Sequence, residues 1–393
     1  MPILMVGFER EELRLSDWEE KFVIGLTGNI GTGKSVVRRM LEHLGAYGID
    51  ADALAQRTYA RGAPGHQAVI KQFGHWIVAP DGEIDRGRLG RIVFADPQAL
   101  ATLEEIVHPL VNQAIDFLIK RSVQPVIVIE AIKLLEAGLD KKCNSVWVAA
   151  APKEVQLTRL TMQRRMSKAE AFQRIEAQPA QALKIAAAQV VINNVGSIED
   201  TWRQVIAGCK QILPAEFIEL SEQPEPAAAK GEFSIIRGNP SHSAEIAELF
   251  NRLEKPARPL RAEDIMEKFG EKAYLLLKVD SKLKAAVGWQ VENLVSRATE
   301  MVIDPDLPSE KVIPALIQVM ERASRVLQCE ASLIFTSPKL VKQDGLWQNL
   351  GYVRMLPETL KVRAWQDAAR ESMPEGTLML FKKLREDRVL RPI

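Results

Sequence analysis

The sequence predicts an α/β domain built on a parallel sheet, followed by a second domain of the α+β class. In the first half, strand-like apolar runs alternate with helical segments, an order typical of a parallel sheet with helices on both faces. In the second half, several strand-like runs follow one another before a long helix. The length of 393 residues exceeds one typical core, so two domains are expected.

Composition places the boundary between the two domains. The segment 215–232 is polar, rich in Pro and Ala, and has no apolar period, as expected of a linker. We therefore expect domains over 21–214 and 233–393, and we interpret 1–20 as an N-terminal extension. The expected strands are 22–26, one ending near Ile49, 126–130, 146–150 and 190–192 in the first domain, and 274–279, 285–291, 299–303, 332–336 and 377–382 in the second, with a helix over 310–327.

The overall composition is that of an ordinary globular protein. A net charge of +1 gives no reason to expect nucleic acid or a membrane surface as a partner. No stretch approaches the ~20 apolar residues that a membrane span needs. The three cysteines, Cys143, Cys209 and Cys329, are far apart and indicate reduced thiols of a cytoplasmic protein. The oligomeric state stays open.

A complete phosphate-binding loop follows the first strand. Its residues are Gly28, Asn29, Ile30, Gly31, Thr32, Gly33, Lys34 and Ser35. An apolar run precedes the loop, and helical spacing follows it over 36–44. A strand, a tight loop and a helix in this order point backbone N–H groups at an anion. The loop therefore predicts binding of a nucleoside triphosphate, with Lys34 at the outer phosphates and the Ser35 hydroxyl on Mg²⁺.

Two carboxylates, Asp50 and Asp52, follow the second expected strand. Residues i and i+2 of an extended segment point to the same side, so both can face the triphosphate. One would accept the proton of an attacking hydroxyl, and either could help to hold Mg²⁺. Helix capping is the alternative for one of them, because a helical run begins at Ala53. Glu130, at the end of another strand, is either a magnesium-binding carboxylate or an ordinary surface residue.

Arginines gather in a helical stretch at Arg159, Arg164 and Arg165, with Arg174 further along. Mobile arginines can cover the charge that phosphoryl transfer spreads over oxygen atoms. A solvated helix face is the simpler explanation of such a charge run. The spacing alone therefore leaves a lid over the phosphates open.

With these motifs, the stretch over about 22–212 resembles dephospho-coenzyme A kinase. The phosphate loop alone is typical of all P-loop proteins, whereas the Asp-Ala-Asp, Asp-Gly-x-Ile-Asp-Arg and His-Pro-Leu segments in this order are far more specific. The matching segments are 24–35, 49–52, 62–65, 73–74, 81–86 with Leu89, 93–94, 108–110, Arg164, 177–178 and 191–194.

The resemblance implies transfer of the γ-phosphoryl group of ATP to the ribose 3′-hydroxyl of dephospho-coenzyme A, with Mg²⁺ as a cofactor. It implies a three-layer P-loop kinase fold with a helical acceptor subdomain over about 59–121 and a lid over about 159–180. Asp52 would take the hydroxyl proton, and Lys34 and Arg164 would act on the phosphates. Further implied roles are nucleotide contacts at 28–35, Val36 and Asn193, acceptor contacts at Asp50, Arg86 and His108, and magnesium ligation by Ser35, Asp52 and Glu130.

The chain departs from the family's pattern outside the phosphate loop. Four residues after the Asp that would act as base, the family commonly has Arg, whereas this chain has Gln56 followed by Arg57. Such departures bear on acceptor affinity rather than on the type of reaction. Read without the family, His108 before Pro109 indicates a helix boundary.

The second domain resembles the acyltransferase fold related to Gcn5. The resemblance rests on 233–237 followed by a helix over 244–253, the strand series and the segment 346–352. In that family, a glycine-containing loop binds the pyrophosphate of acetyl-coenzyme A through its N–H groups. Here the corresponding loop, 304–311, has no glycine, two prolines and three acids, which remove donors and repel phosphates. We therefore expect the fold without ordinary binding of an acyl donor.

Three functions follow from these observations. The first is an active kinase with a non-catalytic acyltransferase-like domain. The second is a bifunctional kinase and N-acetyltransferase that uses acetyl-coenzyme A, and the third is a nucleotide sensor without turnover. The intact phosphate loop argues against the third, and the loop 304–311 argues against the second.

Overall fold

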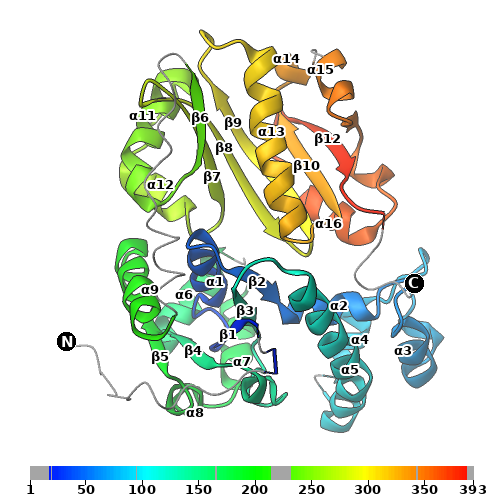
Figure 1. Cartoon of the computed structure of the whole chain (residues 1–393). Helices are drawn as coiled ribbons and strands as arrows, with labels where there is room; N and C mark the ends of the chain where they lie inside the picture. The colour runs from blue at the N-terminus through cyan, green and yellow to red at the C-terminus, as the bar shows by residue number, and fades with distance from the viewer. Residues whose placement is uncertain are drawn as a thin grey trace.

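A computed structural model of the chain describes residues 17–18, 20–93, 95–163, 166–213, 232–341 and 344–386. The described N-terminal domain contains a five-stranded parallel sheet in the order β2-β3-β1-β4-β5 (Figure 1). Its strands are β1 (Phe22–Thr27), β2 (Tyr47–Asp50), β3 (Val126–Glu130), β4 (Ser145–Ala150) and β5 (Val190–Asn193). Its helices are α1 (Lys34–His43), α2 (Ala51–Thr58), α3 (His66–Phe73), α4 (Arg86–Val93), α5 (Pro97–Arg121), α6 (Lys153–Gln163), α7 (Lys168–Glu176), α8 (Gln181–Ala186) and α9 (Ile198–Ile212).

Helices cover both faces of this parallel sheet. Apolar side chains of α1 and α9, among them Val37 and Val205, pack on one face. Side chains of α2 and α5, among them Leu54 and Leu118, pack on the other. Strands β3 and β4 are buried at every position, because helices cover both faces of the sheet. Their sequences are therefore continuous apolar runs instead of alternating apolar and polar residues. The expected three-layer α/β arrangement is confirmed.

Helices α3 and α4 form a small unit beside the sheet, at the right of Figure 1. They share an apolar cluster, which includes Val69 and Leu89, with the N-terminal part of α5. Helix α5 continues through Pro109, so the interpretation of His108 as a helix-boundary residue is wrong. Pro109 removes one N–H donor from the helix, and the burial of Val107 and Val111 on either side of it supports the helical conformation.

The C-terminal domain holds a seven-stranded mixed sheet in the order β11-β12-β10-β9-β8-β7-β6. Strands β9 and β10 are parallel neighbours, and the other pairs are antiparallel. The strands are β6 (Phe233–Arg237), β7 (Ala273–Val279), β8 (Lys282–Glu292), β9 (Val295–Ile303), β10 (Ala331–Thr336), β11 (Val353–Arg354) and β12 (Leu378–Lys383). The helices are α11 (Ser243–Glu254), α12 (Ala262–Lys268), α13 (Ser309–Val326), α14 (Pro338–Val341), α15 (Asp344–Asn349) and α16 (Arg363–Ser372).

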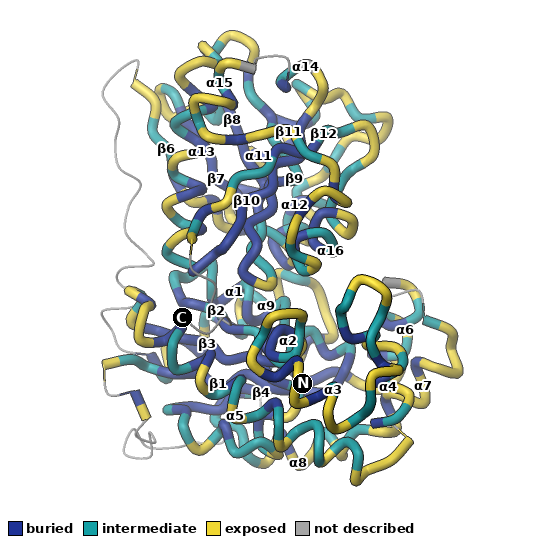
Figure 2. Tube along the Cα trace, turned by 90° about the vertical axis from the view of Figure 1, so that its right-hand side faces the viewer, coloured by how far each residue is buried: buried dark blue, intermediate teal, exposed yellow. Residues whose placement is uncertain are grey.

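Helices also cover both faces of the mixed sheet. Helix α13 packs on one face through Leu316 and its neighbours. Helices α11 and α12 pack on the other face, and α16 packs against β9 and β10 through Trp365. The expected α+β class is confirmed, and the short edge strand β11 is an addition to the predicted strands. Figure 2 shows that the central strands of both sheets are buried, whereas the edge strands β6 and β11 are more exposed.

Two sequence-based interpretations fall at the edges of the described residues. Of the expected linker 215–232, only Glu232 is described. Of the expected extension 1–20, Trp18 is buried in the core of the N-terminal domain and donates from its indole nitrogen to Asp116 at 3.2 Å. The three cysteines are free and buried. Among the helices that the structure describes, none combines the length and the apolar composition that crossing a bilayer requires.

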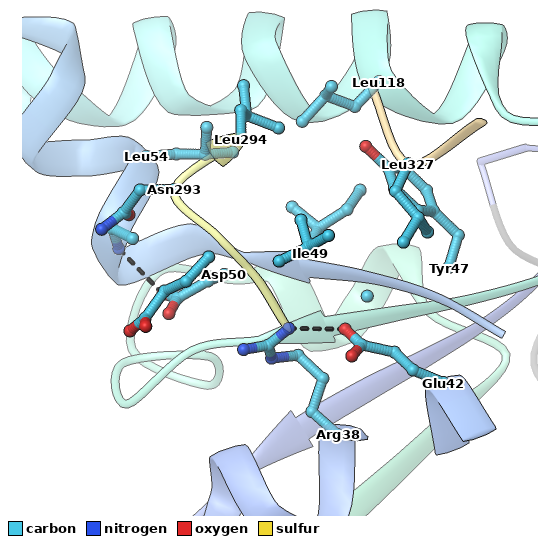
Figure 3. A pocket seen from close by; sticks show the side chains of 14 residues that line it. Arg38, Glu42, Tyr47, Ile49, Asp50, Leu54, Leu118, Asn293, Leu294 and Leu327 are labelled. Atoms are coloured by element: carbon cyan, nitrogen blue, oxygen red, sulfur yellow. Dashed lines mark hydrogen bonds and ion pairs between the residues drawn. The ribbon is translucent and has the colours of Figure 1, made fainter. Parts of the chain in front are cut away.

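The two domains pack directly on one another. The turn between β8 and β9 reaches α2 and α5, and Leu294 at that turn belongs to the apolar core of the N-terminal domain. Figure 3 shows Leu294 between Leu54 and Leu118. Arg57 of α2 forms a buried ion pair with Glu330 at 2.6 Å. The interface therefore has both an apolar and an ionic anchor.

Candidate active site

The phosphate loop adopts a conformation that requires its glycines. Gly28, Gly31 and Gly33 have φ values of 148°, 73° and 89°. A Cβ atom at Gly33 would lie 1.9 Å from Nδ2 of Asn194. A side chain at this position would therefore combine an unfavourable φ with a steric clash.

Residues from distant segments hold the loop in place. Asn194 Nδ2 donates to the Thr32 carbonyl at 2.9 Å, and Arg159 Nη1 donates to the Gly31 carbonyl at 3.2 Å. Gln178, which lies in the segment predicted as a lid, accepts a bond from the Ile30 N–H at 2.7 Å. The described part of the predicted lid therefore contacts the phosphate loop.

The carboxylate of Glu130 lies directly beside the start of α1. The register pairs Glu130 with Leu26 on one side and with Asp50 on the other, so these strand ends meet at one edge of the sheet. The Ser35 hydroxyl donates to Glu130 Oε1 at 2.7 Å, and Arg38 Nε donates to Oε2 at 2.7 Å. Burial opposes ionisation, but the Arg38 and Lys34 cations hold the pKa of the Glu130 carboxyl below its ordinary value.

Asp50 and Asp52 have different surroundings. Asp50 is the N-cap of α2 and accepts the Ala53 N–H at 2.8 Å, so capping explains Asp50 rather than Asp52. Asp52 lies in the first turn of α2 and accepts the Ile132 N–H at 3.1 Å. Burial raises the pKa of Asp52 above its ordinary value, with the Lys34 cation opposing the shift. Burial and Glu130 raise the pKa of Asp50 to about 6.

These side chains face one cavity of about 540 Å³ at the carboxyl edge of the parallel sheet. The predicted site residues among its lining are Ile30, Gly31, Lys34, Ser35, Asp50, Asp52, Arg86 and Glu130. Lys34 is buried, and its ammonium lies 3.4 Å from the Asn29 carbonyl of the loop. The sequence motifs thus converge on a single space, although they are separated by up to about 100 residues.

Other predicted site residues are placed elsewhere. His108 lies in the middle of α5, and it is not among the residues that line the cavity. Asn193 is exposed at the end of β5, where its backbone N–H donates to Gln204. Val36 packs against the core beneath α1. Arg164 lies outside the described residues.

Comparison with known proteins identifies the family to which the residues of this site belong. A family model described as dephospho-CoA kinase matches residues 22–200. A dephospho-CoA kinase from Geobacter metallireducens is 45% identical over 192 residues, which are 48% of this chain and 96% of that protein. The chain belongs to the dephospho-CoA kinase family. The match lies within the N-terminal domain, where every motif of the predicted site also lies.

Solved structures resemble both halves of the chain. The dephospho-CoA kinase from Campylobacter jejuni is 25% identical, with a TM-score of 0.37, over 48% of this chain and 96% of that chain. An acetyltransferase of the GNAT family from Staphylococcus aureus is 14% identical, with a TM-score of 0.32, over 39% of this chain and 100% of that chain.

One wall of the kinase-family cavity comes from the C-terminal domain. Glu292 and Asn293 at the β8–β9 turn, Arg297 of β9, and Asp367 and Glu371 of α16 line it. Sequence reasoning missed these residues because no motif connects them with the phosphate loop. One signal in the sequence could have pointed to this wall. Arg57 follows Gln56, where the chain departs from the family pattern, and Arg57 Nη1 donates to the Asn293 carbonyl at 2.6 Å.

Proposed function

We propose that this chain transfers the γ-phosphoryl group of ATP to the ribose 3′-hydroxyl of dephospho-coenzyme A, giving ADP and coenzyme A. The observation that carries the proposal is the convergence of Lys34, Ser35 and Asp52 on one cavity. Family membership supports the same reaction. In phosphoryl transfer the protein mainly positions the reactants and stabilises charge, and these three side chains serve both tasks.

The residues present fit a nucleotide with a magnesium ion. The positive φ values of Gly28, Gly31 and Gly33 give the loop its tight conformation at the start of α1, and Lys34 supplies a cation beside it. The Ser35 hydroxyl and the carboxylates of Asp52 and Glu130 are oxygen donors, the class that Mg²⁺ prefers. These three residues would hold the ion, which would neutralise charge on the transferred group.

Asp52 is proposed as the general base. As the acceptor oxygen forms its bond to the γ-phosphorus, the hydroxyl proton passes to the Asp52 carboxylate and the bond to the ADP oxygen breaks. Because burial raises the pKa of Asp52, its carboxylate is more basic than an exposed one. We expect kcat/KM to fall in acid, since only the ionised form of Asp52 accepts the proton.

The C-terminal domain is proposed to be non-catalytic. In the loop before α13, the N–H groups of Asp306 and Leu307 already bond within the loop to Asp304. The Asp304 carboxylate is buried against Arg252 and Lys284 at 2.7 and 2.9 Å, and these hydrogen bonds lower its pKa to about 2. Because these N–H groups are already bonded and Pro305 and Pro308 have none, few donors remain for a pyrophosphate here.

The test supplies ATP and dephospho-coenzyme A to the full chain and measures ADP and coenzyme A. Lys34→Ala is expected to lower kcat/KM by at least ~100-fold, because charge stabilisation at the phosphoryl group dominates. Asp52→Asn is expected to lower kcat by roughly 100-fold or more. Lys71→Ala and Glu105→Gln, both at exposed positions, serve as matched controls and should retain activity.

Two outcomes would contradict this proposal. If the wild type forms no coenzyme A, the reaction is wrong. If Asp52→Asn retains a near-normal rate while Lys34→Ala does not, the reaction stands and the base is wrongly assigned. Calorimetry of the full chain with acetyl-coenzyme A tests the bifunctional alternative, which requires saturable binding that survives Lys34→Ala.

A further inference from the structure

A second cavity joins the proposed acceptor site to the C-terminal domain. It has a volume of about 360 Å³ and shares Arg57, Arg86 and Ala364 with the cavity that contains Asp52. One side of it is the N-terminal segment 57–63, and the other is the C-terminal segment 361–364. A ligand that reaches from one cavity into the other would therefore touch both domains.

The second cavity is rich in cations. Arg61, Arg86, Lys361 and Arg363 line it, and Glu83 is the only carboxylate among its described lining residues. Arg57 also lines it, but the buried pair with Glu330 neutralises this side chain. Arg363 pairs with Asp81 and lies 3.9 Å from Asp367, so the positive charge of the cavity comes mainly from Arg61, Arg86 and Lys361, and this charge predicts an anionic group in this space.

The domains are fixed to each other at the edge of this cavity. Arg363 Nη1 bonds Asp81 Oδ2 at 2.6 Å, which joins α16 to the turn before α4. Arg86 Nη1 donates to Gln56 Oε1 at 2.8 Å, so Arg86 is oriented from α2. The four cations are thus presented by two domains that hold one relative position.

We propose that the C-terminal domain completes the acceptor site, with Lys361 and Arg363 binding, together with Arg61 and Arg86, the diphosphate of the acceptor. This inference rests on the proposed function, because dephospho-coenzyme A carries its diphosphate on the ribose whose 3′-hydroxyl reacts. The hydroxyl lies at Asp52 in the first cavity, and the diphosphate lies among the cations of the second. The C-terminal domain is therefore a substrate-binding element of the kinase.

The test compares a charge-removing and a charge-retaining double variant of the full chain. Lys361→Ala with Arg363→Ala is expected to raise KM for dephospho-coenzyme A by about tenfold or more, with KM for ATP changed less than about twofold. Lys361→Arg with Arg363→Lys should stay within about threefold of wild type, because both charges remain. Lys282→Ala with Arg258→Ala, which removes two exposed charges outside the cavities, is the matched control.

Two further measurements separate recognition from a structural effect. Rising salt should raise KM for dephospho-coenzyme A in the wild type and much less in the charge-removing variant, since exposed charges are screened. Calorimetry with dephospho-coenzyme A alone gives the dissociation constant without turnover. An unchanged dissociation constant in the charge-removing variant would overturn the inference, and so would an equal loss in the charge-retaining variant. Failure of the wild type to form coenzyme A would instead overturn the proposed reaction.

Discussion

At the scale of single residues, His43 lies between the two domains in a setting that disfavours its protonation. Its Nε2 bonds the Phe269 carbonyl at 2.9 Å, and its ring contacts Trp202 and Phe269 edge-on. Because a carbonyl only accepts, the neutral ring carries its proton on Nε2. Burial, with a contribution from the Arg237 cation, lowers the pKa of His43 to about 3.

This shift predicts a specific loss of stability in acid. The unfolded chain protonates His43 near pH 6.5 and the folded chain only near 3, so the unfolded state binds more protons between these values and stability falls as pH drops. Relative to His43→Gln, which keeps a donor for Phe269, the wild type should lose about 2 kcal/mol between pH 8 and pH 5.

Denaturant unfolding of both proteins at the two pH values measures this difference. Asp50, whose raised pKa acts in the opposite direction, is present in both proteins and cancels in the comparison. Equal pH dependence of the two proteins would show that His43 is not buried against Phe269 in solution.

Single residues also divide into those that sequence motifs could predict and those that they could not. Lys34, Ser35 and Asp52 were predictable because their spacing from the loop and the second strand fixes their place on the sheet edge. Arg38 and Asn194 were not assigned roles, because each acts through a contact with a distant segment. The spacing of Arg159 leaves a mobile lid open, whereas in the structure this side chain donates to the Gly31 and Thr32 carbonyls of the phosphate loop.

At the scale of elements, the β8–β9 hairpin has an unusual turn. Asn293 and Leu294 have φ values of 52° and 60°, as a two-residue type I′ turn demands. Glycine is the usual second residue of such a turn, and a leucine there costs roughly 1 kcal/mol. Leu294 is nevertheless only 9% exposed, because it lies in the core of the other domain. Burial outweighs the strain.

This competition predicts an order of stability among variants at position 294. Leu294→Ala loses the burial and keeps the strain, so we expect a loss of about 2–4 kcal/mol in the free energy of unfolding. Leu294→Gly loses the burial but relieves the strain, so it should be more stable than Leu294→Ala by about 0.5–1 kcal/mol.

The turn at Asp280 and Ser281 offers a matched control. It has φ values of 47° and 64° and lies between β7 and β8, where Ser281 is exposed. Ser281→Gly should therefore stabilise the protein slightly, as measured by thermal and denaturant unfolding. A stabilising Leu294→Gly would contradict the role assigned to Leu294.

Most elements could be predicted, since apolar periodicity is a local property. The five strands of the parallel sheet lie within one or two residues of the expected ranges. The short β11 was not predicted, because two residues carry no period. The sequence also could not predict that the turn at Asn293 lines the cavity, since this depends on how the turn packs against the other domain.

At the scale of the whole molecule, the ion pair between Arg57 and Glu330 joins domains that are distant in sequence. Both side chains are buried, with 7% and 1% of their surfaces exposed. Removal of one partner leaves a buried charge without compensation, whereas replacement of both by apolar residues removes that penalty.

We expect Glu330→Gln to lower the free energy of unfolding by on the order of 3 kcal/mol. Arg57→Met with Glu330→Leu should cost less than Glu330→Gln alone. Glu170→Gln, which breaks the exposed pair with Arg174, is the control and should change stability by less than about 0.5 kcal/mol. Additive effects of Arg57→Met and Glu330→Leu in a double-mutant cycle would show that the pair does not couple the domains.

The packing of the domains was beyond sequence reasoning for a physical reason. Domain class follows from local patterns, but docking depends on which surfaces are complementary after both domains have folded. The sequence does show one departure from the family pattern, at Gln56, and the interface residue Arg57 follows it directly. Arg57 lines both cavities, which is consistent with an effect of this departure on acceptor affinity.

The position of Leu294 has a consequence for synthesis on the ribosome. The N-terminal domain is translated about 80 residues before the leucine that fills its core. At about 5–20 residues per second, the nascent domain exposes the apolar surface around Leu54 and Leu118 for several seconds. We expect chaperone binding to the nascent chain to peak in that interval and to end once the β8–β9 hairpin has emerged.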